Sequence, residues 1–205
     1  MARAIHDFAR TARSFGAANA VTAARAAVAL MLLGLAAEAM VGRLVLDGAA
    51  RWIAAAVAVL ALLSDGLDGW LARRHGRASP FGARFDMESD ALLVLALALL
   101  VLMAGQAGGF VLVSGALRYL FVAAGWAVPA LRATLPPSRR RQIVCVVQVI
   151  CLIAALAPPV PPGAGQALAA AGLALLLYSF AVDTTTLLSH PLRPEGGEGA
   201  SAASE

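Results

Sequence analysis

The chain has 205 residues, of which 60% are hydrophobic and 14% are charged, and its mean hydropathy is +0.80. This composition leaves too little polar surface for a soluble globule, so we expect a membrane protein. The net charge is +4 and every Lys or Arg position is an arginine, which indicates cytoplasmic anchoring of membrane segments rather than a nucleic-acid partner. Cys145 and Cys151 lie six residues apart in one apolar run, where a single helix would hold both, and this excludes a disulfide scaffold.

Apolar stretches of membrane-spanning length, separated by charges and by turn residues, predict an all-α membrane protein with six transmembrane helices. In chain order we expect them near Ala18–Met40, Ala49–Arg73, Gly82–Ala104, Gly108–Leu131, Gln142–Ala157 and Gln166–Leu188. Their connections are too short to divide the chain, so residues 16–190 should form a single domain.

The two ends of the chain differ from this domain. Residues 1–15 place Ile5, Phe8, Ala12 and Phe15 at helical spacing with arginines between them, which predicts a short amphipathic helix lying in the membrane interface. Residues 191–205 are too polar to bury anything, and we expect a disordered tail.

The arginines predict the orientation of the bundle. They gather in the N-terminal arm, in the connections after the second and fourth predicted helices, and in the tail, whereas the first loop on the opposite side has only Arg43 and Arg51. Positive residues favour the cytoplasmic face, so we expect both termini in the cytoplasm, with a bacterial cell membrane as the most natural location.

Carboxylates are concentrated where the second and third predicted helices meet the cytoplasm. Five of the 12 acidic residues lie there: Asp65, Asp68, Asp86, Glu88 and Asp90. Spacings of three and four residues put Asp65 with Asp68, and Asp86 with Asp90, on shared helix faces. Such a cluster repels itself unless cations lie within it. Oxygen ligands favour Mg²⁺ or Mn²⁺, and a pair of these ions is the clamp used for displacement at phosphorus.

Two simpler interpretations of this cluster remain open. The acids can form an interfacial salt-bridge network with neighbouring arginines, namely Arg73, Arg74, Arg77 and Arg84. Alternatively, they can line a cation or proton path in a small transporter.

The complete spacing of the segment is more specific. Asp65-Gly-Leu-Asp68-Gly69-Trp-Leu-Ala72-Arg73 is followed after eight residues by Gly82, then by Asp86 and Asp90 at intervals of four. This resembles the signature of the CDP-alcohol phosphotransferase family, D-x2-D-G-x2-A-R-x8-G-x3-D-x3-D, and matches all eight fixed positions without a gap. Asn19-Ala-Val-Thr22-Ala-Ala-Arg25 resembles a second element, N-x2-T-x2-R, of many members.

The resemblance implies a role for each matching residue. Asp65, Asp68, Asp86 and Asp90 would hold two metal ions, and Asp90 would also act as general base on the acceptor hydroxyl. The residues that would contact the CDP group are Asn19, Thr22, Gly69, Ala72, Arg73 and Ser79. The reaction implied is phosphatidyl transfer from CDP-diacylglycerol to a small polar alcohol, with release of CMP. We also expect a homodimer.

The signature does not identify the acceptor alcohol. Members that use glycerol 3-phosphate, and many cardiolipin synthases, tend to continue after the last aspartate with a lysine, whereas this chain continues Asp90-Ala91-Leu92-Leu93. Arginines available to an anionic acceptor are Arg118, Arg132 and Arg139 to Arg141, although those beyond the fourth helix also fit a membrane anchor. Arg118 is an isolated charge in an apolar run, and Asp183 is a possible ion-pair partner for it.

Two alternative functions stay open at this stage. The same signature occurs with the reverse arrangement, in which a CDP-aminoalcohol donates its headgroup to diacylglycerol. A cation-binding transport or scaffold protein without turnover is the alternative from a different class.

Overall fold

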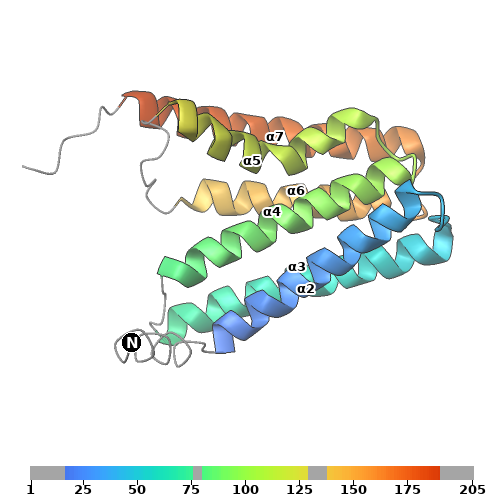
Figure 1. Ribbon diagram of the computed structural model, residues 1–205, viewed down its shortest axis with the longest axis horizontal. Coiled ribbons are helices and arrows are strands. Elements are labelled where there is room, and N and C mark those ends of the chain that lie inside the picture. The colour runs from blue at the N-terminus through green and yellow to red at the C-terminus, as the bar shows by residue number, and fades with distance from the viewer. Residues whose placement is uncertain (1–16, 76–79, 129–137, 190–205) are drawn as a thin grey trace, which may run out of the picture.

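The computed structural model describes residues 17–75, 80–128 and 138–189, with side chains for 22–64, 85–128 and 138–189 (Figure 1). The described part is entirely helical, with one short 3-10 turn and no strand, which confirms the predicted all-α class. Its elements are α2 (Ala17–Met40), α3 (Gly48–His75), α4 (Pro80–Met103), η1 (Gly109–Val111), α5 (Leu112–Ala127), α6 (Arg139–Leu156) and α7 (Pro162–Ser189). The predicted arm (1–15) and tail (191–205) lie outside the described residues.

Three helical segments in the described part are long and apolar enough to cross a membrane: Thr22–Met40, Gly109–Ala127 and Pro162–Ser189. Large apolar side chains more than half exposed occur on α2, α3, α5, α6 and α7, for example Met31, Ile53, Trp126, Ile143 and Tyr178. Apolar exposure on so many helices suits a lipid environment. The count of six spans remains a prediction.

Two helices begin at a proline. Pro80 is the first residue of α4 and Pro162 the first of α7, because proline has the backbone angle of a first helical residue and needs no amide partner there. α6 begins at Arg139, so its predicted start at Gln142 was wrong. A span chosen by hydropathy excludes the charged first turn of α6, although this turn is helical. Its arginines can extend toward water.

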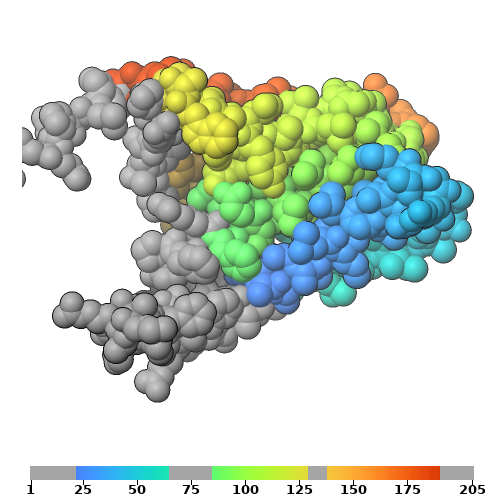
Figure 2. All heavy atoms as spheres, viewed as in Figure 1, coloured from blue at the N-terminus to red at the C-terminus, as the bar shows by residue number. Residues whose placement is uncertain are grey.

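α4 lies at the centre of the bundle. It packs against α2, α5 and α6, while α2 also packs on α3 and α6 on α7. Figure 2 shows α2, α4 and α5 side by side on one face without a gap. The buried face of α2 has Ala29, Leu32 and Ala36 at helical spacing. Alanines at such positions allow two helix backbones to approach closely.

Successive helices run in opposite directions. The starts of α2, α4 and α6 and the final residues of α3, α5 and α7 therefore lie at the same end of the bundle (Figure 1). We call this the carboxylate end, because Asp86 and Asp90 lie in the first half of α4.

The opposite end is held together by an arginine. Nε and Nη2 of Arg51 donate to the carbonyl oxygens of Leu156 and Ala157 at 2.9 and 3.1 Å. With its amide oxygen turned to Arg51, buried Gln106 accepts from this guanidinium at 2.9 and 3.2 Å and donates to the Val160 carbonyl at 3.3 Å. Arg51 thus satisfies carbonyls that the C-terminus of α6 leaves without helical partners.

The contact between α4 and α5 depends on a glycine. A Cβ built at Gly115 would lie 2.6 Å from the Leu95 Cα and 2.7 Å from its Cδ1. Gly115→Ala should therefore push the two helices apart and destabilise the fold by about 1–3 kcal/mol. We expect a lower midpoint of thermal unfolding in detergent.

Gly34→Ala on α2 is the matched control, because a Cβ at Gly34 has nothing within 4 Å. It should leave stability unchanged or raise it by up to about 1 kcal/mol, since alanine favours the helix. Equal melting of both variants would contradict the close approach at Gly115.

Candidate functional site

Asp86 and Asp90 converge on one positive charge. Both lie on α4, four residues apart and therefore on one helix face. Nη1 of Arg25 donates to Oδ1 of Asp86 at 2.8 Å, and Nη2 of the same guanidinium donates to Oδ1 of Asp90. The Arg25 side chain is 5% exposed, whereas those of Asp86 and Asp90 are 44% and 30% exposed. A buried cation from α2 thus bridges two partly accessible carboxylates of α4 and offsets one of their two negative charges.

The two carboxylates fit a hard divalent cation. The Arg25 guanidinium occupies a position where a metal cation could bind. Its contacts show that one carboxylate oxygen of each aspartate converges on a positive charge. Carboxylate oxygens are also the donors that Mg²⁺ and Mn²⁺ prefer. Among the described side chains no three His, Cys, Asp or Glu residues form a metal-binding group. Asp65 and Asp68 lie on α3, which ends at the carboxylate end, but their side chains are outside the described set.

The predicted CDP contacts are described only in part. Thr22 is buried on α2, one turn before Arg25, so the second sequence element places both residues on one helix face. Asn19 lies on the first turn of α2, and Gly69, Ala72 and Arg73 lie on α3; their side chains belong to the undescribed set. Ser79 and Arg132 are outside the described residues.

Arg118 has a different partner from the one suggested by the sequence. Its Nη2 donates to Oε1 of Glu88 at 2.5 Å, so the predicted pairing with Asp183 was wrong. Glu88 lies between the two metal-ligand candidates along α4, and it reaches the adjacent helix α5. The ion pair gives Arg118 a carboxylate partner on the adjacent helix α4, while its buried Nε has no hydrogen-bond partner among the described residues.

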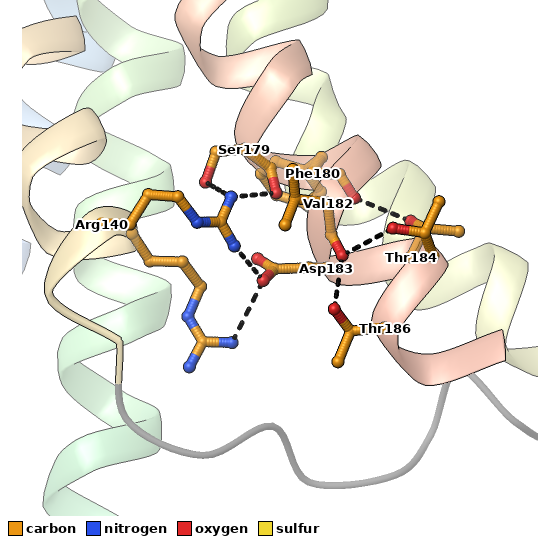
Figure 3. A network of polar contacts seen from close by, with 9 residues as sticks. Arg140, Ser179, Phe180, Val182, Asp183, Thr184 and Thr186 are labelled. Atoms are coloured by element: carbon orange, nitrogen blue, oxygen red, sulfur yellow. Dashed lines mark hydrogen bonds and ion pairs between the residues drawn. The ribbon is translucent and has the colours of Figure 1, made fainter. Parts of the chain in front are cut away.

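Asp183 belongs to a separate network between α6 and α7 (Figure 3). Nη2 of Arg140 donates to Oδ1 of Asp183 at 2.5 Å, and its Nη1 donates to the Ser179 carbonyl and hydroxyl at 2.7 and 3.0 Å. Arg141 lies 3.8 Å from the same carboxylate. Of the three consecutive arginines predicted for the acceptor, Arg140 and Arg141 thus face Asp183, and Arg139 is exposed. Arg140 and Arg141 therefore join the start of α6 to α7.

Sequence reasoning named Arg25 only as the last residue of the second sequence element, and Arg140 only as one of three arginines available to an acceptor or a membrane anchor; it gave neither residue its ion pair. An isolated arginine inside the first apolar stretch was a usable signal for Arg25, because a charge at that depth needs a partner. Arg140 carried no such signal, since its position in a run of three arginines is also typical of a membrane anchor.

The new pairing predicts the outcome of double-mutant cycles. In the cycle of Arg140→Ala and Asp183→Ala, the loss in the double variant should fall short of the sum of the single losses by about 1–3 kcal/mol. The cycle of Arg118→Ala and Asp183→Ala should be additive within about 0.5 kcal/mol, because these residues share no contact. Unfolding free energies from SDS titration in mixed micelles measure both. Coupling in the second cycle and additivity in the first would reverse this assignment.

Comparison with known proteins identifies the family to which the chain belongs. The family model described as CDP-alcohol phosphatidyltransferase matches residues 15–179, which include α2 to α6 and most of α7. No solved structure shows significant similarity to the chain. The match contains the whole segment from Asp65 to Asp90, with Arg25 and Arg140, and ends before Asp183. Because it covers most of the 205 residues, the chain belongs to the CDP-alcohol phosphatidyltransferase family.

Proposed function

We propose that this protein transfers the phosphatidyl group of CDP-diacylglycerol to the hydroxyl of a small polar alcohol and releases CMP. The family consists of transferases of CDP-alcohol phosphatidyl groups. The observation that carries the proposal is the convergence of Asp86 and Asp90 on one cationic position, since displacement at a diphosphate needs concentrated positive charge.

Four aspartates are proposed to hold the metal ions: Asp65, Asp68, Asp86 and Asp90. The family generally uses divalent metal ions. When bound, two Mg²⁺ or Mn²⁺ ions would supply the charge that stabilises the diphosphate and the attacking oxygen. α3 and α4 both reach the carboxylate end, and their antiparallel course lets the two aspartate pairs contribute to one site.

Asp90 is the proposed general base. The alcohol oxygen forms a bond to the phosphorus that carries the diacylglycerol, the bond from this phosphorus to the CMP oxygen breaks, and the hydroxyl proton passes to Asp90. Asp90 is 30% exposed at its side chain. A water-borne alcohol can therefore approach it.

The nucleotide is proposed to lie between α2 and α3. Gly69 and Ala72 would leave room for it against the α3 backbone, and Arg73 would offer a forked donor to the diphosphate. Asn19, Thr22 and Ser79 complete the proposed contacts. Buried Thr22 on the same face as Arg25 supports the placement on α2.

The active site is proposed to face the cytoplasm, with six membrane spans and both termini on that side. CMP and a polar alcohol are water-borne, whereas the diacylglycerol chains stay in the bilayer. The exposed apolar side chains of five helices support this embedding. A homodimer is the proposed assembly.

The acceptor is proposed to be a polyol or a polyol phosphate. Arg118, Arg132 and Arg139 are the candidate residues for its anionic or hydroxyl groups. Glu88 fixes the Arg118 guanidinium beside the α4 segment that carries Asp86 and Asp90. Glu88 lies two residues from each aspartate, on a different face of α4, so Arg118 is proposed to lie at the edge of the acceptor site.

The experiment that tests this function offers CDP-diacylglycerol and a panel of radiolabelled alcohols to the purified protein, with products separated by thin-layer chromatography. CMP release and a labelled lipid are expected, and both should stop on exhaustive chelation. Product only from a CDP-aminoalcohol and diacylglycerol would favour the reverse arrangement. No CMP from any pair would favour a cation-binding protein without turnover.

Asp90→Asn should lower the transfer rate by more than about a hundredfold, because it removes the proton acceptor. CDP-diacylglycerol binding should persist, since the nucleotide contacts remain. Glu38→Gln is the control, because Glu38 lies at the other end of α2 in an exposed pair with Arg43 at 3.8 Å. A variant that kept more than about a hundredth of the wild-type rate would exclude Asp90 as the base.

Arg118→Ala should raise the KM of the acceptor by about tenfold or more, the effect of losing one charge-assisted hydrogen bond. The KM of CDP-diacylglycerol should stay within about twofold of wild type if Arg118 contacts only the acceptor. Steady-state kinetics with each substrate varied in turn measure both values. Equal increases would place Arg118 outside the acceptor site.

A further inference from the structure

We propose that Arg25 is an internal counter-cation, which holds Asp86 and Asp90 together before a divalent ion binds and gives up this position when the ion arrives. The inference rests on the proposed function, because it takes these aspartates as metal ligands. It makes Arg25 a positioning residue that tunes metal affinity.

The geometry of the contact carries the inference. One buried guanidinium donates from two different nitrogens to two carboxylates, so a single side chain of α2 bridges ligands that lie a full turn apart on α4. The contacts are made by Oδ1 of each aspartate, so an ion that took the same position would compete with Arg25 for these oxygens. Mg²⁺ binds such oxygens at about 2.0–2.1 Å. Arg25 and the ion would then be like charges separated by a few ångströms, and their repulsion favours one occupant at a time.

A counter-cation is needed because Asp86 and Asp90 lie on one face of an apolar bundle. Without positive charge between them, their mutual repulsion would raise the energy of the folded state. Arg25 is 5% exposed, so its own charge also needs these carboxylates. The pairing therefore stabilises both partners while no metal is bound.

A mainly apolar hollow lies beside Arg25. This hollow of about 100 Å³ between α2 and α3 is lined by Ala24, Arg25, Val28, Leu60, Ala61 and Ser64. This volume exceeds that of a single water molecule. The Ser64 hydroxyl donates to the Leu60 carbonyl at 2.7 Å, which leaves its oxygen lone pairs as acceptors for a displaced guanidinium.

Displacement has a measurable consequence. If the arrangement open to the ion is populated about one-tenth of the time, the apparent affinity for the ion falls about tenfold. Removing the Arg25 charge should abolish this competition and tighten metal binding. It should also expose the repulsion between the carboxylates when no metal is present.

The test uses the purified full chain with Mn²⁺ as the probe. Free Mn²⁺ is measured by electron paramagnetic resonance during titration, and thermal unfolding is recorded in chelator and in saturating Mn²⁺. The variants are Arg25→Gln and Arg25→Lys, with Arg43→Gln as the control because Arg43 pairs only with exposed Glu38 among the contacts of the described residues.

Arg25→Gln should bind Mn²⁺ about tenfold more tightly than wild type. Its unfolding midpoint should fall in chelator, and the difference from wild type should shrink in saturating Mn²⁺. Arg25→Lys keeps the charge without the fork, so its affinity should lie between the two. Arg43→Gln should match wild type in both measurements.

Unchanged or weaker Mn²⁺ binding in the Arg25 variants would overturn the inference, as would an equal loss of melting temperature with and without the ion. If Arg25→Gln does not fold, Arg25→Lys decides by the same criteria. CMP release by the wild-type protein, assayed on the same preparation, reports separately on the proposed function. Tighter Mn²⁺ binding without CMP release would leave Arg25 its role and remove the transferase assignment.

Discussion

The site depends on a guanidinium that lies between two carboxylates. Arg25 enters from α2, Asp86 and Asp90 from α4, and α4 is the helix against which α2, α5 and α6 all pack. Charges at this depth are costly unless they are paired. The pairing therefore ties the position of α2 to that of α4, and it is the contact on which both the fold and the proposed chemistry rely.

Charges elsewhere in the bundle follow the same constraint. The pair of Arg118 and Glu88 joins α4 to α5, and Arg140 with Asp183 joins α6 to α7. At the opposite end Arg51 donates to main-chain carbonyls of α6 instead of to a carboxylate. Interhelical pairs thus cluster toward the carboxylate end, where α2, α4 and α6 begin. There they fix the neighbours of the proposed site.

Much of the fold could be predicted from the sequence, because apolar length and turn residues are local signals. The helices occupy nearly the predicted ranges, and the differences arise where a proline or an arginine forms a first helical turn, as at Pro162 and Arg139. The ion-pair partner of a charged residue, in contrast, depends on which helices lie side by side, and the sequence gives no local signal for that. Asp183 and Glu88 were both available to Arg118 in the sequence, and only the adjacency of α4 and α5 selects Glu88. The spacing of Asp86 and Asp90 predicted their shared face, but it carried no information that Arg25 would lie between them.

The central claim is that the carboxylate cluster holds metal ions against the diphosphate of the lipid nucleotide. The most direct measurement is electron–nuclear double resonance on the protein loaded with Mn²⁺ and CDP-diacylglycerol, which detects ³¹P nuclei coupled to the bound ion. The account predicts a resolved ³¹P coupling in the wild-type protein and its loss in Asp86→Asn. Bound Mn²⁺ without ³¹P coupling, or a coupling that persists unchanged in Asp86→Asn, would contradict it.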